Sequence, residues 1–285
     1  MIKHVSDFIS LVESNSAKYK DNPHFLFRGE SLTTYTLVPT LYRTRNCTPN
    51  KFVYLYPNTE RKILLEFMTE AAGYVDSLSV DDFSRWVEFA QHFGVPTRLL
   101  DWTSNPLIAL FFACIDNLNQ DGRIYILHSR AYKELADKAN RDEMEGKMIK
   151  DVVKGMILEQ EKGFKYPIIY APYHLDKRMV AQASRFMVWG SILKPLDELI
   201  TELEKEGKSQ VWIKKQCGKG AIADVLEDAM VLASVVVSGK YKKRLLHELD
   251  ALGISYASIF PGLEGLGRSI KWRNDKSNSE YDRFD

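Results

Sequence analysis

The chain has 285 residues, a formal net charge of +1 at pH 7, 45% hydrophobic residues and 27% charged residues. This is the composition of a globular protein with a packed core, and so small a net charge gives no overall attraction to nucleic acid, although local basic patches can still form. The three cysteines include no CxxC pair, which predicts buried thiols in a reducing compartment and neither a disulfide framework nor a metal site. No apolar run reaches the roughly 20 residues that cross a bilayer, and the N-terminus lacks a secretory h-region, so we expect a cytoplasmic protein without membrane contact.

The N-terminal part predicts a helix, a strand, a long loop and two more helices. Apolar residues at helical spacing predict an amphipathic helix over residues 4–20, and residues 24–29 are expected to form a short strand. Residues 31–58 are rich in Pro, Asn and Thr and predict mostly loop. Helices are then expected over about 59–79 and over 82–92.

A helix with a marked start is expected near the middle of the chain. Residues 94–103 cannot be helical throughout, and Pro106 stands where a helix makes its first turn. One of residues 103–105 is expected to be the N-cap, so residues 107–115 predict a buried helix. Residues 122–128 are rich in β-branched and aromatic side chains and predict a strand.

The remaining elements alternate irregularly between helix and strand. In chain order they are solvent-facing helices over 130–162, a strand at 167–171, a short helix at 176–182, strands at 185–190, 210–215 and 231–237, and helices at about 240–252 and after Pro261. This order, without strict βαβ alternation, predicts an α+β fold with a mixed, mostly antiparallel sheet and surrounding helices. With no clear linker or repeat, we expect one domain over residues 1–273 and a disordered tail over 274–285.

Two clusters combine polar groups with Gly or Pro geometry. Residues 27–30 place Arg28 at a strand end before Gly29, which suits a phosphate or carboxylate ligand. A structural salt bridge from Arg28 to an acid is the alternative. Residues 91–105 collect His, Arg, Asp, Trp and hydroxyl groups before a helix N-terminus, which suits a nucleotide.

The second cluster also has a structural alternative, and a third cluster is weaker. In the alternative, Arg98 and Asp101 pair to stiffen the loop while Trp102 plugs the core. The third cluster covers residues 178–186, where Gln182 is able to hydrogen-bond a ribose hydroxyl. The sequence contains no Walker-type GxxxxGK[ST], no GxGxxG, no GxSxG elbow and no HExxH.

With these residues in view, the chain resembles the FRG-domain family, which is named for a Phe-Arg-Gly segment. The resemblance rests on residues 27–29, 38–43, 91–113, 182–186 and 243–263. A second resemblance, to ADP-ribosyltransferases, concerns the order of the motifs. An Arg-Gly at a strand end, followed by Thr-Ser before a helix, is similar to the arginine and serine motifs of those enzymes, which implies an ADP-ribosyltransferase-like fold.

That second resemblance implies roles for particular residues. Arg28 is expected to anchor NAD, the substrate, and Thr103 or Ser104 to form the second motif. The third motif is normally a glutamate that orients the ribose 2′-hydroxyl, and here its place falls on Gln182, which carries no charge. Either Gln182 holds the ribose by hydrogen bonds alone, or another acid completes the site, or the protein binds nucleotide without turning it over. The candidates for that acid are Asp101, Glu159 and Glu161, although the Glu-x-Glu at 159–161 lies in a charged helical stretch typical of a solvated face.

His92 is a candidate general base, or alternatively a histidine that stabilises the core or the loop. The residues expected to contact NAD are Phe27, Arg28, Gly29, Arg98, Asp101, Trp102, Thr103 and Ser104, and those expected to act in catalysis are Arg28, Ser104, Gln182 and His92.

FRG-type proteins resemble components of bacterial conflict systems. The resemblances imply an NAD-dependent ADP-ribosyltransferase that acts as an intracellular toxin or phage-defence effector, modifies RNA, DNA or protein, and has an antitoxin or chaperone as partner. The alternatives are a non-enzymatic nucleotide- or nucleic-acid-binding sensor and an interaction scaffold. Two groups of basic residues are candidates for nucleic-acid contact: Lys205, Lys208, Lys214, Lys215 and Lys219, and Lys240, Lys242, Lys243 and Arg244.

Overall fold

The computed structural model describes residues 2–16, 24–43, 59–75, 78–79, 81–171, 177–207 and 231–275. The strands in these segments are β1 (Phe25–Glu30), β2 (Leu99–Thr103), β3 (Gly122–His128), β4 (Ile168–Tyr170), β5 (Ser184–Val188) and β6 (Leu232–Val237). They form a six-stranded antiparallel sheet in the order β4-β5-β2-β1-β3-β6. With the helices that surround it, the sheet confirms the expected α+β class.

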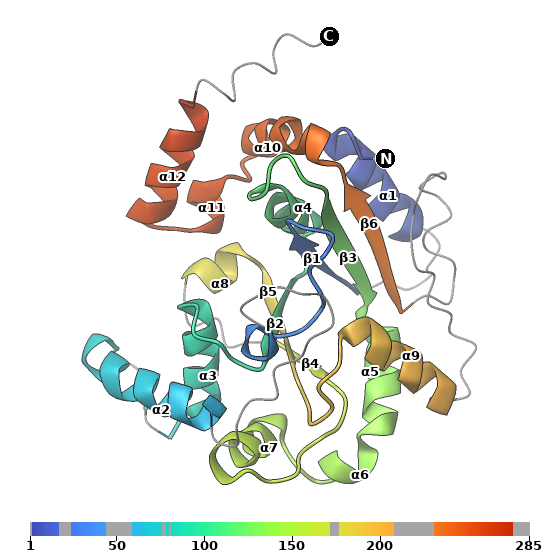
Figure 1. Ribbon diagram of the computed structural model, residues 1–285, viewed down its shortest axis with the longest axis vertical. Coiled ribbons are helices and arrows are strands. Elements are labelled where there is room, and N and C mark those ends of the chain that lie inside the picture. Colours follow the sequence, from blue (N-terminus) through green and yellow to red (C-terminus); the bar gives the residue numbers. More distant parts are fainter. Residues whose placement is uncertain are drawn as a thin grey trace.

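The α-helices are α1 (Val5–Ser16), α2 (Thr59–Ala71), α3 (Phe83–His92), α4 (Pro106–Cys114), α5 (Ser129–Ala139), α6 (Arg141–Met144), α7 (Ile149–Lys154), α8 (Lys177–Ala181), α9 (Leu196–Gly207), α10 (Lys242–Ala251), α11 (Tyr256–Ile259) and α12 (Leu263–Arg273). Short 3₁₀ turns cover Thr40–Tyr42, Ala72–Tyr74 and Gly239–Tyr241, and a π-helical turn covers Gly155–Glu159. Figure 1 shows the arrangement of these elements.

Most of the expected elements are confirmed, and several differences are found. The helix expected over residues 59–79 ends at Ala71, where a 3₁₀ turn containing Gly73 begins. Strand β2 and helices α9 and α11 were not predicted. Strand β2 is only five residues long and has a central aspartate, and α11 has only four residues. The strand expected at 210–215 and the tail from residue 276 lie outside the described residues.

The sheet consists of two halves that meet at a single registered pair. Strand β1 pairs with β3 along its whole length, and β2 pairs with β5 along its whole length. Between β1 and β2 the registered pair is Phe27 with Thr103. The two central strands therefore separate beyond Phe27, which leaves an interruption in the middle of the sheet.

Three hydrophobic clusters cover the two faces of this sheet. Side chains of α1, α4 and α10 pack on one face of the β1-β3-β6 half, and those of α2, α3 and α7 pack on the β2-β5-β4 half. Helices α5 and α9 cover the opposite face. Because successive side chains of a strand alternate between faces, Asp101 and Thr103 lie on the face of α3 and α4, and Leu100 and Trp102 lie on the other.

Helix α4 lies directly against the interrupted part of the sheet. Its start is the predicted one: Asn105 is the N-cap and accepts a hydrogen bond from the backbone N–H of Leu107 at 2.9 Å, and Pro106 is the first helical residue. A Cβ atom at Gly29 would lie 1.8 Å from the carbonyl oxygen of Ala109. Gly29 is thus needed for the close approach of β1 to the α4 backbone.

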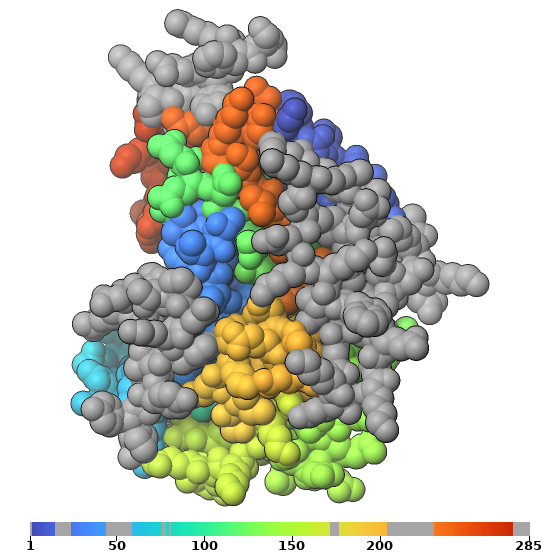
Figure 2. Space-filling view, turned by 45° about the vertical axis from the view of Figure 1, so that its right-hand side comes forward, coloured from blue at the N-terminus to red at the C-terminus, as the bar shows by residue number. Residues whose placement is uncertain are grey.

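The segment that follows β1 lies on the molecular surface and is held at both ends. In Figure 2 this segment, in blue, lies between the orange C-terminal region and the gold of α9. The backbone N–H of Thr33 donates to the carbonyl of Asp121 at 3.0 Å, and that of Leu196 donates to the carbonyl of Leu37 at 3.1 Å. These bonds fix the segment as one wall of the site described next.

Candidate functional site

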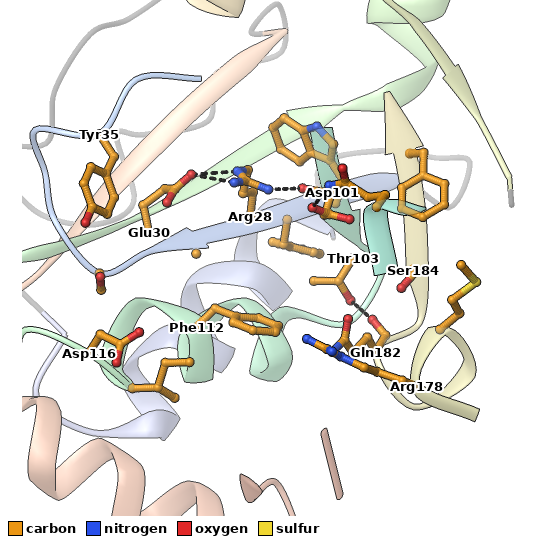
Figure 3. Close-up of a pocket in the computed structure, with 18 of the residues that line it drawn as sticks. Arg28, Glu30, Tyr35, Asp101, Thr103, Phe112, Asp116, Arg178, Gln182 and Ser184 are labelled. Carbon is orange, nitrogen blue, oxygen red and sulfur yellow. Dashed lines mark hydrogen bonds and ion pairs between the residues drawn. The ribbon is translucent and has the colours of Figure 1, made fainter. Parts of the chain in front are cut away.

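A cavity of about 610 Å³ lies over the interrupted part of the sheet, between α3 and α4. Strands β1, β2 and β5 form its floor, and α8 closes one side (Figure 3). It is lined by Phe27, Arg28, Gly29, Glu30, Ser31, Tyr35, Gln91, His92, Asp101, Trp102, Thr103, Phe112, Ile115, Asp116, Asn117, Arg178, Met179, Gln182, Ser184 and Phe186. The cavity thus brings together most of the residues that the sequence predicts for the site.

Arg28 connects the two halves of the sheet across the interruption. Its Nη1 donates to the backbone carbonyl of Asp101 at 2.6 Å, and its Nε and Nη2 contact Oε1 of Glu30 at 2.8 and 2.7 Å. Extending the β1–β2 register would place Gly29 opposite Asp101. Instead of pairing with the β1 backbone, the Asp101 carbonyl accepts a hydrogen bond from the Arg28 guanidinium, which therefore lies at the edge of the cavity.

Glu30 neutralises this end of the cavity. The residue is 6% exposed and its Oε1 also lies 3.5 Å from Nη2 of Arg43. Burial lowers the pKa of Arg43, with the nearby Arg28 charge acting in the same direction and Glu30 opposing both. The structural salt bridge considered as the alternative role of Arg28 is therefore present, and it coexists with the position of Arg28 at the cavity.

Asp101 and Arg98 do not pair with each other, so the loop-stiffening pair expected between them is wrong. Asp101 Oδ2 accepts a hydrogen bond from Nε2 of Gln91 at 2.7 Å. Arg98 contacts both carboxylate oxygens of Glu60, with Nε to Oε1 at 2.8 Å, and donates to the carbonyl of Trp189. Burial opposes the charge of Arg98, but Glu60 and Tyr42 together outweigh it, so the pKa of Arg98 lies above its ordinary value.

Arg98 consequently lies outside the cavity, and its expected contact with NAD has no support in the geometry. The physical reason is its place one residue before β2, where its side chain is buried between α2 and the end of β5.

Of the two hydroxyl residues expected as second motif, Thr103 faces the cavity and Ser104 does not. Thr103 Oγ1 donates to the carbonyl of Gln182 at 2.7 Å and accepts from the backbone N–H of Asn105 at 3.1 Å. Ser104 follows the end of β2, is exposed and has its Oγ 3.5 Å from the carbonyl of Ala183. Because Ser104 is not among the lining residues, its expected role in binding and catalysis does not fit this geometry.

Gln182 lines the cavity, but its side chain is engaged elsewhere. Its Nε2 donates to the carbonyl of Ile259 at 3.3 Å, which ties α8 to α11. Glu159 and Glu161 do not line the cavity. Among the described residues, the acids that do line it are Glu30, Asp101 and Asp116.

Trp102 is a core residue that reaches the cavity with only a small part of its surface. It is 2% exposed and belongs to the cluster under α5 and α9, so it plugs the core and offers no open face for a base to stack on. Its Nε1 is buried and has no hydrogen-bond partner among the described residues. This nitrogen is enclosed in the core.

His92 and Arg178 form the rim on the α3 and α8 side. Arg178 Nη1 lies 3.5 Å from the backbone carbonyl of His92, and its guanidinium stacks 4.5 Å from the centre of the Phe260 ring. Gln91, Arg178 and Ser184 fall inside the second and third clusters of the sequence, but no role was predicted for any of them. Their place at the cavity depends on tertiary contacts, which join elements far apart in the chain.

Lys242 is not part of a basic surface. It is fully buried, and its Nζ donates to the carbonyls of Ser31, Asp116 and Asn117 at 2.7, 3.1 and 3.2 Å. Burial lowers the pKa of Lys242. The residue joins the end of β1 to the end of α4 beside the cavity. The candidate basic residues from 208 to 219 lie outside the described residues.

The described residues contain no group of three or more His, Cys, Asp or Glu side chains that could hold a metal ion. No described helix is long and apolar enough to cross a membrane. Cys114 is a buried free thiol, as expected, and Cys47 and Cys217 lie outside the described residues.

Comparison with protein families bears on the segment that carries β1, β2 and α4. Residues 23–122 match the FRG domain. The match covers 100 of the 285 residues and includes Arg28, Asp101 and Thr103. It supports the expected FRG family. The matched part of the chain is shorter than residues 27–263, over which the sequence resemblance was expected to extend. Searches of curated proteins and of solved structures find no match.

The FRG domain match ends at the start of β3, so the cavity draws on residues from outside it. Arg178, Gln182 and Ser184 come from α8, β5 and the turn between them. The matched segment supplies the interrupted pair of strands with Arg28, and the later segment closes the cavity.

Proposed function

We propose that this protein is an NAD-dependent ADP-ribosyltransferase that acts in the cytoplasm as a toxin or phage-defence effector. The observation that carries the proposal is the position of Arg28, two residues before the end of β1 and beside the cavity, with Thr103 on the cavity floor. An arginine followed along the chain by a hydroxyl residue is the order of motifs that the resemblance to ADP-ribosyltransferases implies. The effector role rests on the resemblance of FRG-type proteins to bacterial conflict systems.

The residues of the cavity fit NAD in size and in chemistry. A volume of about 610 Å³ falls within the range of roughly 300–1,000 Å³ of small-molecule and cofactor pockets. Arg28 uses three of its five N–H groups on Glu30 and Asp101, so two remain for a phosphate or ribose oxygen.

The proposed reaction transfers ADP-ribose to an acceptor. The bond between C1′ of the nicotinamide ribose and the ring nitrogen breaks, and its electron pair leaves with nicotinamide. An acceptor atom forms a new bond to C1′ and loses a proton. Charged and polar groups fixed in advance around the reacting carbon are expected to supply most of the acceleration.

The cavity residues divide this work between them. Arg28 holds the phosphate and ribose side of the substrate, and Glu30 keeps the added positive charge small. Thr103 supports the β2–α4 turn through its bonds to Gln182 and Asn105. His92 lines the rim of the cavity, and its proposed role is to take the acceptor proton. The acceptor remains RNA, DNA or protein, with an antitoxin or chaperone as partner.

The proposal is tested by incubating purified protein with NAD labelled in the adenylate part and with cell lysate, followed by separation of protein, RNA and DNA. Label is expected in one fraction and lost in Arg28→Ala. Arg268→Ala is the matched control, because Arg268 forms an exposed pair with Glu264 on α12, away from the cavity lining. No label in any fraction from folded wild-type protein, together with no release of nicotinamide, would contradict the proposal.

A second candidate function is favoured by one observation. The amide of Gln182, which stands where the third motif is expected, is bound to Ile259 and carries no charge. A site without a catalytic acid would suit a sensor that binds a nucleotide or a nucleic-acid end without turnover. Binding of NAD measured by calorimetry, with no nicotinamide released, would support this sensor over the transferase.

A further inference from the structure

We infer that Asp101 supplies the carboxylate that the third motif lacks, and that Thr97 and Gln91 position it. This inference rests on the proposed transferase function. Asp101 acts on the ribose from β2, in the middle of the sheet, in place of a glutamate on a later strand. Thr97 and Gln91 are positioning residues, because they act through Asp101.

Asp101 is the cavity acid in the described chain whose geometry suits this role. Glu30 is buried and contacts both Arg28 and Arg43. Asp116 lies after the C-terminal end of α4, at the far end of the cavity from Gln182 in Figure 3. Asp101 is exposed between two buried neighbours in β2, so its carboxylate leaves the sheet toward the cavity.

The direction of the Gln91 amide follows from the bonds of Thr97. Thr97 Oγ1 accepts a hydrogen bond from the backbone N–H of Leu99 at 3.1 Å and lies 2.6 Å from Oε1 of Gln91. Its single hydroxyl proton is therefore donated to the Gln91 oxygen, which turns the amide nitrogen toward Asp101. That nitrogen donates to Asp101 Oδ2 at 2.7 Å.

The hydrogen bonds from Thr97 to Gln91 and from Gln91 to Asp101, called the relay below, leave one carboxylate oxygen of Asp101 for the substrate. Among the described residues Oδ2 of Asp101 accepts from Gln91, and Oδ1 makes no hydrogen bond. The carbonyl of the same residue holds the guanidinium of Arg28 at 2.6 Å. Asp101 therefore sets the anchor for the substrate through its backbone and presents a carboxylate beside that anchor.

The carboxylate has a definite task in the proposed reaction. Oδ1 accepts a hydrogen bond from a hydroxyl of the nicotinamide ribose, and its negative charge favours the positive charge that develops at C1′ as the bond to nicotinamide breaks. No bond forms between Asp101 and the substrate, and no proton is transferred to it. Its removal is thus expected to slow the reaction more than it weakens binding.

The test compares four variants by two measurements: the rate constant kcat for nicotinamide release and the Kd for NAD from calorimetry. Asp101→Asn is expected to lower kcat by about 100-fold and to change Kd by less than about threefold. Gln91→Met, which keeps the side-chain length but removes the donor, is expected to lower kcat by about tenfold at similar Kd. Thr97→Ser keeps the hydroxyl and should behave like wild type, whereas Thr97→Val should resemble Gln91→Met.

Controls separate this inference from the proposed function. Glu161→Gln alters an exposed acid outside the cavity and should leave kcat unchanged. If wild type releases nicotinamide and Asp101→Asn does so at the same rate, the role of Asp101 is wrong while the transferase stands. If wild type neither binds nor consumes NAD, both fail. Should Thr97→Val not fold, the comparison of Gln91→Met with wild type decides the relay, and equal kcat values would overturn it.

Discussion

The guanidinium of Arg28 donates to the backbone carbonyl of Asp101 across the place where β1 and β2 separate. One side chain thereby replaces backbone pairing between the two central strands. Because the strands are registered at Phe27 and Thr103 and separate beyond that pair, polar groups of both strands face a cavity rather than each other. The candidate site is thus a consequence of an interrupted ladder.

Replacing Arg28 is expected to affect both stability and ligand binding. In Arg28→Ala the buried Glu30 loses its nearest cation, which should lower the free energy of unfolding by about 3 kcal/mol, the lower end for breaking a buried pair, since Arg43 stays nearby. Urea unfolding measures this loss. Arg28→Lys keeps the charge without the planar fork, so it should lose less stability yet still bind NAD weakly. Equal affinity of Arg28→Lys and wild type for NAD would refute the anchoring role.

Gly29→Ala is expected to be strongly destabilising for a purely steric reason. The added Cβ would lie 1.8 Å from the Ala109 carbonyl oxygen and 2.7 Å from the Ala113 nitrogen, so α4 must move away from β1. A loss of about 3 kcal/mol or more in unfolding free energy is expected. Gly73→Ala is the matched control, because nothing lies within 4 Å of its added Cβ. Similar unfolding midpoints for the two variants would show that the close approach of α4 is not required.

Arg98 is expected to matter for folding and not for NAD affinity. Arg98→Met leaves Glu60 without its buried partner and should cost about 3–5 kcal/mol, measured by urea unfolding. The double variant Arg98→Met with Glu60→Leu removes both charges and should recover a large part of this loss. Calorimetry on the folded double variant should give the wild-type Kd for NAD. A tenfold weaker affinity for NAD would show that Arg98 does contribute to the binding site.

Cys114 links stability to alkaline pH. Burial raises the pKa of its thiol from 9.0 to about 12, with the charge of Lys242 opposing the shift. When the pH rises above 9.0, the thiol loses its proton in the unfolded chain but keeps it in the folded protein. The contribution of this thiol to stability is therefore complete below pH 9.0 and falls as the pH rises toward about 12. Unfolding free energies between about pH 8 and about pH 10 should therefore fall more steeply for wild type than for Cys114→Ala.

A thiol-labelling experiment checks the same group directly. Iodoacetamide followed by mass mapping should leave the Cys114 peptide unmodified in the native protein and modify it in urea. Parallel pH profiles for wild type and Cys114→Ala, together with rapid native labelling of this peptide, would contradict the buried thiol.

Local patterns in the sequence were sufficient for most elements and for part of the site. The Asn105-Pro106 start of α4, the strand around Phe27 and the strand at 122–128 follow from capping, proline geometry and side-chain type, which act over a few residues. These same signals predicted the strand that carries Arg28, although the strand continues to Glu30 and Arg28 lies inside it. The predicted helix over 59–79 was too long, because apolar spacing alone marks a helix end poorly.

Tertiary structure alone decided which polar groups share the cavity. Arg98 and Asp101 are three residues apart, yet one is buried against Glu60 from α2 and the other faces the cavity beside Gln91. A strand sends successive side chains to opposite faces, so the fate of each depends on which helix covers that face, and such contacts join residues far apart in the chain. For that reason Arg28 and Gln182 were recognisable from the sequence, whereas the interruption of the sheet and the relay to Asp101 required the folded chain.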